Sequence, residues 1–138
     1  YVGVVINKEV LKKVGLPQKD FFINQDDTEH SLRLSKEGKI VCVPDIIVHH
    51  DTNKGISRLD WKKYYQIRNR YYAYKYNFPQ RYSAFYYFET YIKYYIKKIF
   101  RLRTADELEM YKIALVDIRN DSLGMSDIYK PGWKPQKQ

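Results

Sequence analysis

The feature that most constrains the fold of this chain is a change in composition near residue 60. Residues 1–60 carry nine basic and nine acidic side chains, whereas residues 61–138 carry 16 basic and seven acidic ones. The second part therefore holds the whole net charge of +9, together with 14 of the 15 tyrosines. Because the two parts differ so much, we expect different kinds of structure in them, and an anionic partner for the second.

The first part has the pattern of a compact α/β unit. Runs rich in β-branched residues predict three short strands, over residues 1–6, 39–43 and 46–49. Asn7 and Gly15 bound a predicted helix between them, and a second predicted helix begins at Asp26 and ends at Gly38.

The second part has the pattern of a helical region. The sequence predicts helices over residues 61–76, 83–102 and 105–120, each with apolar residues three or four positions apart or with a capping residue in front. Residues 127–138 contain proline and glycine and predict an extended tail. The expected organisation is therefore 1–60, 61–126 and 127–138.

Two further features limit the class of protein to which the chain can belong. Cys42 is the only cysteine, which excludes an internal disulfide, and its β-branched surroundings predict a buried, inert thiol. No apolar run is long enough to span a bilayer, which needs about 20 residues. The chain starts in a strand-like run without an initiator methionine, so we expect it to be a piece of a longer protein.

The clearest candidate for chemistry is the pair Asp26 and Asp27, which lies at the start of a predicted helix. The pair has a structural interpretation, because a helix N-terminus favours negative charge. It also has a functional one, because one carboxylate can act as a base while its neighbour supports the helix. The sequence alone leaves both interpretations open.

A second candidate is the histidine pair His49 and His50 at the end of a predicted strand. Neighbouring strand residues point to opposite faces, so at most one of the two should face the same cleft as Asp27. A divalent ion would need further oxygen or nitrogen ligands. The first 60 residues contain no Asp-x-Asp element that could supply them.

The order of these motifs resembles the second half of the family 2 glycosyltransferases, which have the GT-A fold. The resemblance runs from about Gly3 to Tyr72. The motifs that carry it are Gly3-Val4-Val5-Ile6-Asn7, Val14-Gly15-Leu16-Pro17, Phe21-Phe22-Ile23-Asn24-Gln25-Asp26-Asp27-Thr28-Glu29, Leu32-Arg33, Gly38-Lys39-Ile40-Val41, Val43-Pro44-Asp45, Val48-His49-His50, Trp61-Lys62-Lys63-Tyr64-Tyr65 and Arg68-Asn69-Arg70. Within the family, the chain looks most like the galactofuranosyl- and rhamnosyltransferases that build bacterial surface polysaccharides.

The resemblance implies an α/β fold, namely the acceptor-side C-terminal part of a GT-A nucleotide-diphospho-sugar transferase, followed by an α-helical tail. It implies an inverting hexosyltransferase in which Asp27 is the general base and Asp26 orients it. The donor would be a UDP- or dTDP-sugar, and the acceptor a glycan or a lipid-linked glycan. A divalent cation, Mg²⁺ or Mn²⁺, would be bound by His50, with His49 as the alternative, and completed by an Asp-x-Asp motif outside this chain. Without that N-terminal half, we expect the chain to be inactive.

Five further residues have two interpretations each. Trp61, Tyr64 and Tyr65 could line the acceptor site, or they could be packing residues. Arg33 and Arg68 could hold the acidic loop as ion-pair partners, or they could contact phosphate.

The helix predicted over residues 83–102 carries a basic stripe, formed by Lys93, Lys97 and Arg101, beside its apolar face. Basic and tyrosine side chains together suit an anionic membrane surface, which would place the enzyme in the cytoplasm, on the inner face of the cell membrane. The alternative is a solvated helix face. Nucleic acid is a disfavoured partner, since no nucleic-acid-binding motif is present. The rival to the enzyme hypothesis is a non-catalytic basic helical module that binds an anionic membrane or nucleic acid.

Overall fold

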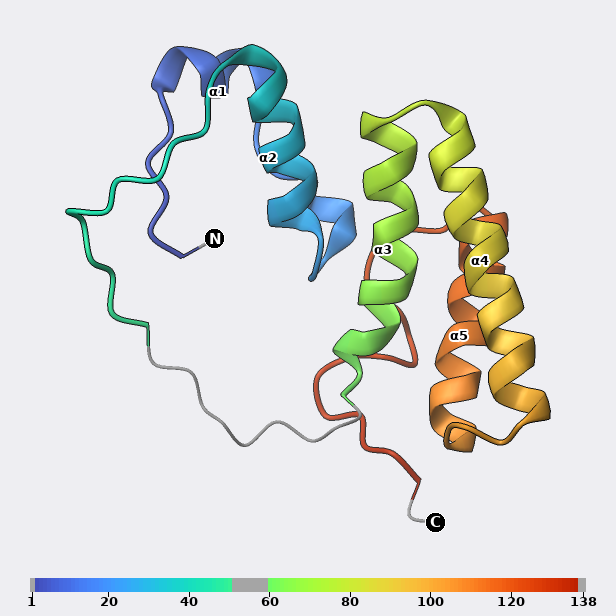
Figure 1. Ribbon diagram of the computed structural model, residues 1–138. Helices are drawn as coiled ribbons and strands as arrows, with labels where there is room; N and C mark the ends of the chain where they lie inside the picture. The colour runs from blue at the N-terminus through green and yellow to red at the C-terminus, as the bar shows by residue number, and fades with distance from the viewer. Residues whose placement is uncertain (1, 51–59, 137–138) are drawn as a thin grey trace.

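The computed structural model describes residues 2–50 and 60–136, and within these ranges the chain is helical (Figure 1). The helices α3, α4 and α5 run side by side, and α2 lies against α3. The elements are α1 (Lys8–Val14), a 3-10 turn (Lys19–Phe21), α2 (Asp26–Glu37), α3 (Lys62–Asn77), α4 (Gln80–Ile99) and α5 (Ala105–Arg119).

The expected α/β fold is wrong for the described part of the chain. The runs at 2–6, 39–43 and 46–49 are extended there, but none of them is assigned as a strand. Their β-branched composition favours an extended backbone, whereas a strand also needs a neighbouring backbone to share a hydrogen-bond ladder. In the described residues these segments make one backbone hydrogen bond besides the helix ends, a turn from Ile46 N to Val43 O at 3.2 Å.

These extended segments are also unusually exposed. Val5 is 97% exposed and Ile47 is 76% exposed. The expected burial of Cys42 is wrong for the same reason: its segment has no covering element among the described residues, and the thiol is exposed. Gly3 lies beside Val48, so the two extended segments approach each other without pairing.

Several predicted helix boundaries are confirmed. The side chain of Asn7 accepts a hydrogen bond from Glu9 N at 2.8 Å, and Gly15 ends the helix. Thr104 caps α5 by accepting from Glu107 N at 3.3 Å. The predicted start of α4 at residue 83 is three residues late, because Pro79 supplies the extended residue in front of Gln80.

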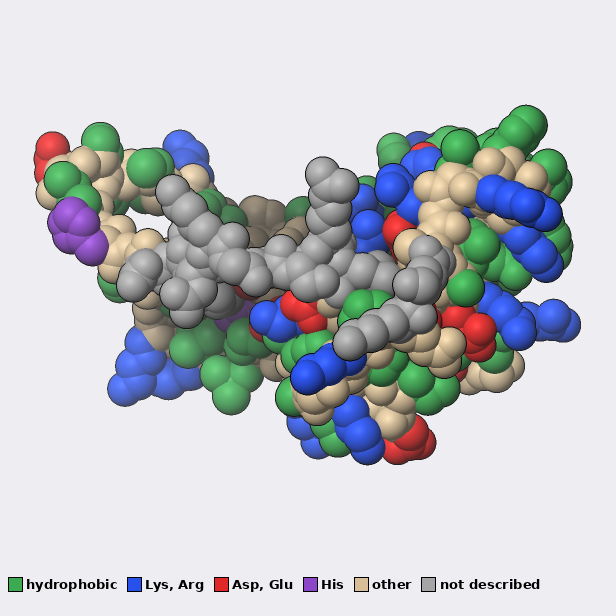
Figure 2. Space-filling model, turned by 90° about the horizontal axis from the view of Figure 1, so that it is seen from below, with side chains coloured by type: hydrophobic (Ala, Val, Ile, Leu, Met, Phe, Trp, Pro, Cys, Tyr) green, Lys and Arg blue, Asp and Glu red, His purple; other side chains and the backbone are tan. Residues whose placement is uncertain are grey.

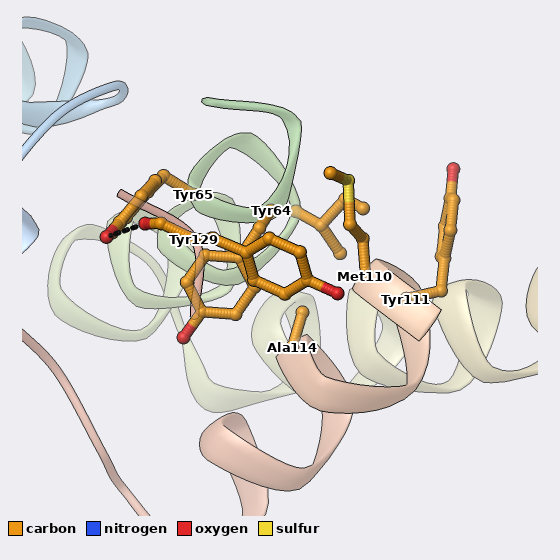
Figure 3. Close-up of a cluster of buried hydrophobic side chains, with 7 residues drawn as sticks. Tyr64, Tyr65, Met110, Tyr111, Ala114 and Tyr129 are labelled. Atoms are coloured by element: carbon orange, nitrogen blue, oxygen red, sulfur yellow. Dashed lines mark hydrogen bonds between the residues drawn. The ribbon is translucent and has the colours of Figure 1, made fainter. Parts of the chain in front are cut away.

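The main core is a cluster of tyrosines with methionine and alanine between α3, α5 and the C-terminal segment (Figure 3). Tyr64 and Tyr65 of α3 pack in a T-shaped arrangement with ring centroids 4.8 Å apart. The hydroxyl of Tyr65 donates to the backbone oxygen of Tyr129 at 2.6 Å, and Tyr129 itself is buried. The predicted tail therefore has no helix, but it folds back and closes the core.

A second cluster fixes the region in front of α2. Phe21 of the 3-10 turn is fully buried against Tyr72 and Ala73 of α3 and Ile118 of α5. Because Phe21 is anchored in this way, the four residues that connect it to α2 start from a fixed point. The candidate site is built on that connection.

Candidate active site

The loop that leads into the acidic pair has an unusual backbone. Phe22, Asn24 and Gln25 all have positive φ angles, of 63°, 64° and 67°. The left-handed region costs an L-residue roughly 1–2 kcal/mol, and none of the three is a glycine. Such a backbone persists only where the surroundings hold it, and strained backbone of this kind gathers at functional sites.

The side chain of Asn69, in the middle of α3, holds this loop. Its amide nitrogen lies 2.8 Å from Phe21 O, 2.9 Å from Ile23 O and 2.9 Å from Asn24 O. Three carbonyls can only accept, so the group that faces them must be the NH₂ donor. The amide oxygen of Asn69 accepts from Arg68 Nε at 3.0 Å, which fixes the same orientation.

A second contact joins the loop to the start of α3. The side-chain amide of Asn24 donates to the backbone oxygen of Lys62 at 3.0 Å. Phe22, which is partly exposed, lies against Trp61 with ring centroids 6.1 Å apart. The loop is therefore held by α3 at two places, at Asn69 in the middle of the helix and at Lys62 at its start.

The acidic pair forms the first two residues of α2. Asp27 is exposed, and its Oδ1 accepts from Thr28 N at 2.7 Å, while Asp26 is partly buried. Gln25 precedes the helix without a side-chain cap, so the negative charge of both aspartates lies at the positive end of the helix dipole.

Asp27 lies at an open groove of about 450 Å³. Hydroxyl-bearing side chains of α2 share this groove with apolar ones from α2 and from the two extended segments. They are Thr28, Ser31 and Ser35, with Val2, Leu32 and Ile40. Mixed hydroxyl and apolar lining beside a carboxylate matches the surface of a sugar ring, which has polar edges and apolar faces.

Arg33 has the ion-pair role. Its Nε donates to Glu29 Oε1 at 2.7 Å, and its two terminal nitrogens donate to the backbone oxygens of Val14 and Leu16. These bonds fasten α2 to the end of α1. Glu29 is fully buried and turned toward Arg33, so its side chain does not cap the start of α2.

Arg68 is also structural. It is 1% exposed, lies over the rings of Tyr64 and Tyr65 at 5.1 and 5.0 Å, and donates to Gly124 O at 2.9 Å. Its Nη1 donates to the hydroxyl of Tyr64, which in turn donates to Asp117. Burial and the bond to Asp117 raise the pKa of Tyr64, so its hydroxyl stays protonated.

Of the three aromatic residues considered for the acceptor, only Trp61 lies at the edge of the fold. Tyr64 and Tyr65 are fully buried in the main core and have the packing role. Trp61 is partly buried, stacks edge-on to Tyr65 at 5.7 Å, and lies beside Phe22. Trp61 and Phe22 together offer an aromatic surface next to the acidic loop.

The histidines lie apart from the acidic pair. His49 and His50 are exposed on the extended segment after α2, and neither lines the groove of Asp27. In the described residues no three His, Cys, Asp or Glu side chains gather to bind a metal ion. The metal site expected at His50, or at His49, is thus not formed by this part of the chain alone.

A second groove, of about 540 Å³, lies between α3 and α4. Its charged lining is mixed: Lys93 pairs with Glu89 at 2.5 Å, Lys63 pairs with Glu107 at 3.7 Å, and Arg70 lines it from α3. The hydroxyl of Tyr86 donates to Ile67 O at 3.1 Å along one side. The sequence does not predict this groove, because its residues come from helices that are separated in the chain.

The contact of the loop that the sequence did not predict is the one made by Asn69. Asparagine is a weak helix former, since its side chain competes for backbone hydrogen bonds, and its place in the middle of a long helix is a signal that sequence alone offers. The signal does not reveal which carbonyls the side chain meets.

Comparison with protein-family models, with curated proteins and with solved structures finds no match for this chain. Among the described helices, none is both long enough and apolar enough to cross a bilayer.

Proposed function

We propose that this chain is the acceptor-side part of an inverting glycosyltransferase that transfers a sugar from a nucleotide-diphosphate donor to a glycan or lipid-linked acceptor of a cell-surface polysaccharide. The observation that carries the proposal is the bonding of Asn69 to three carbonyls of the strained loop before Asp26 and Asp27. The arrangement fixes the backbone that leads into the acidic pair, as is needed for a carboxylate that must be presented at a fixed place.

Asp27 acts as the general base. Its exposed carboxylate takes the proton from an acceptor hydroxyl while that oxygen bonds to the anomeric carbon of the donor. The bond from the anomeric carbon to the diphosphate oxygen breaks in the same step, and the nucleotide diphosphate leaves with the electron pair. One displacement inverts the configuration at that carbon. Asp26, partly buried beside it, orients Asp27 or the acceptor.

The groove at Asp27 suits the acceptor sugar. The hydroxyls of Thr28 and Ser35 can exchange hydrogen bonds with sugar hydroxyls, while Leu32 and Ile40 can cover an apolar ring face. Trp61 lies beside Phe22 of the loop and does not line this groove, so its contact with the acceptor stays a prediction.

The donor and any metal ion require residues beyond these. A divalent cation, Mg²⁺ or Mn²⁺, would stabilise the leaving diphosphate, but the described residues do not fit a metal site by themselves. We propose that a donor-binding half with an Asp-x-Asp motif, outside these 138 residues, supplies it. The isolated chain is then inactive. Since nucleotide-sugars are cytoplasmic, the reaction belongs at the inner face of the cell membrane.

The test is transfer of labelled sugar from UDP- and dTDP-sugars to a lipid-linked acceptor, with proton NMR of the product. The full-length protein should transfer with inversion at the anomeric carbon, and the 138 residues alone should not. Retention of configuration, turnover by the isolated chain, or no transfer from any donor would each contradict the proposal.

A further inference from the structure

The helix α4 is attached to the rest of the fold by its polar face. Ser83 and Thr90 are buried, and Tyr87 and Tyr94 pack against the two core clusters. These positions are four, three and four residues apart, so they form one stripe along the helix. The inward stripe consists of small hydroxyl side chains and tyrosines.

The opposite face of α4 is apolar and exposed. At about 100° per residue, positions 85, 88, 92, 96 and 99 lie about 180° from Ser83 and Thr90. An amphipathic helix of a soluble domain normally turns its apolar stripe toward the core, so α4 is reversed. The exposed fractions along this face are 68% for Phe85, 61% for Phe88, 40% for Ile92, 45% for Ile96 and 70% for Ile99.

The apolar face continues beyond the helix end. Phe100 is 68% exposed and Leu102 is 59% exposed. We call the seven exposed side chains of this surface, from Phe85 to Leu102, the α4 apolar face. Isolated exposed apolar residues are normal, whereas seven of them within residues 85–102 are typical of an interaction site.

The charge beside this face is mostly positive, with Glu89 as the acidic exception. Residues 91–103 contain five basic side chains and no acidic one: Lys93, Lys97, Lys98, Arg101 and Arg103. In Figure 2, Lys and Arg side chains gather with hydrophobic ones on the side of the molecule where α4 lies. Tyr91 and Tyr95, both partly exposed, lie at the edge of the apolar face.

The basic residues do not all point the same way. Lys97, expected from the sequence to face a membrane, instead donates to the hydroxyl of Tyr111 at 2.7 Å and lies 4.2 Å from its ring. Lys93 forms an ion pair with Glu89 at 2.5 Å, and Arg101 is exposed just after the helix. The apolar side chains, more than the expected basic stripe, therefore occupy the centre of the exposed face.

We propose that the α4 apolar face lies flat on an anionic lipid bilayer, with its aliphatic and phenyl side chains in the headgroup–acyl boundary and its cations among the headgroups. Buried apolar area and attraction to anionic lipid both contribute to such binding. Nucleic acid would be attracted to the cations, but the exposed isoleucines would contribute nothing to its binding. A protein partner would need an apolar groove about 30 Å long with acidic borders. The inference does not depend on the proposed activity.

The test is flotation of the whole chain with vesicles of phosphatidylcholine alone or with an equal part of phosphatidylglycerol. We expect binding to the anionic vesicles, weakened by added salt, and at least a tenfold loss of binding in the triple variant Phe85→Ser, Phe88→Ser, Ile92→Ser. Val116→Ser on α5, an exposed apolar side chain outside this face, is the matched control and should bind as the parent does.

The triple variant should keep the circular dichroism and melting temperature of the parent, because it changes exposed side chains. Three results would overturn the proposal: no binding to anionic vesicles, binding that the triple variant retains, or a dimer in solution that the triple variant abolishes. The last would assign the face to a second copy of the chain.

Discussion

Asn69 donates from its side-chain amide to the carbonyl oxygen of Asn24 across 2.9 Å, which joins the middle of α3 to the loop in front of α2. The same nitrogen meets the carbonyls of Phe21 and Ile23. One side chain of a long helix thus fixes the backbone that presents Asp26 and Asp27.

Replacing Asn69 with aspartate should destabilise the fold. The change keeps the shape of the side chain but turns a buried donor into an acceptor that faces three carbonyl oxygens. Leaving such groups unpaired costs about 3 kcal/mol in free energy of unfolding. Urea denaturation measures this change in the free energy of unfolding. Gln66→Glu, the same chemical change at an exposed position of α3, is the control and should stay within about 0.5 kcal/mol of the parent.

Arg68 and Arg70 provide a matched pair for the role of the buried guanidinium. Arg68→Lys loses the bonds to Asn69 and Gly124 O and the stacking on two tyrosine rings, and should cost about 3 kcal/mol. Arg70→Lys changes an exposed side chain on the same helix and should be nearly neutral. Equal stabilities of the two variants in thermal or urea unfolding would show that the Arg68 network does not support the fold.

The buried tyrosines predict a loss of stability at high pH. Burial raises the pKa of Tyr129 to about 12, above its ordinary value near 10. The contribution of Tyr129 to stability is therefore complete below pH 10 and is lost as the pH rises toward 12, by up to about 1.4 kcal/mol per pH unit. Tyr129→Phe should make that decline shallower in urea titrations across this range. Tyr82→Phe, an exposed tyrosine, should leave the slope unchanged.

The sequence predicted the helices well because their signals are local. Asn7, Gly15, Gly38 and Thr104 bound helices where expected, since a cap acts on backbone groups within one turn. The strand predictions were wrong because a β-branched composition favours an extended backbone but cannot provide a pairing partner. Val5 and Ile47 have strand composition and lie exposed.

The orientation of α4 could not be predicted from the sequence either. The spacing of Phe85, Phe88 and Ile92 predicts a helix with an apolar face, but it does not say which face meets the core. Ser83 and Thr90 pack against the neighbouring helices instead. At the candidate site, the position of Asp27 at a helix start was predictable from the motif. The part played by Asn69 was not, because its three acceptors lie 45 to 48 residues away in the chain.

The measurement that tests the central claim most directly is the rate of sugar transfer by Asp27→Asn in the full-length protein, with Asp26→Asn beside it. Asparagine keeps the size of the side chain but cannot take a proton, so kcat for Asp27→Asn should fall by about 10²–10⁴-fold while the melting temperature stays unchanged. Asp26→Asn should retain more activity than Asp27→Asn. A rate for Asp27→Asn close to that of the parent would contradict the account, and the acidic pair would then be a feature of the helix start alone.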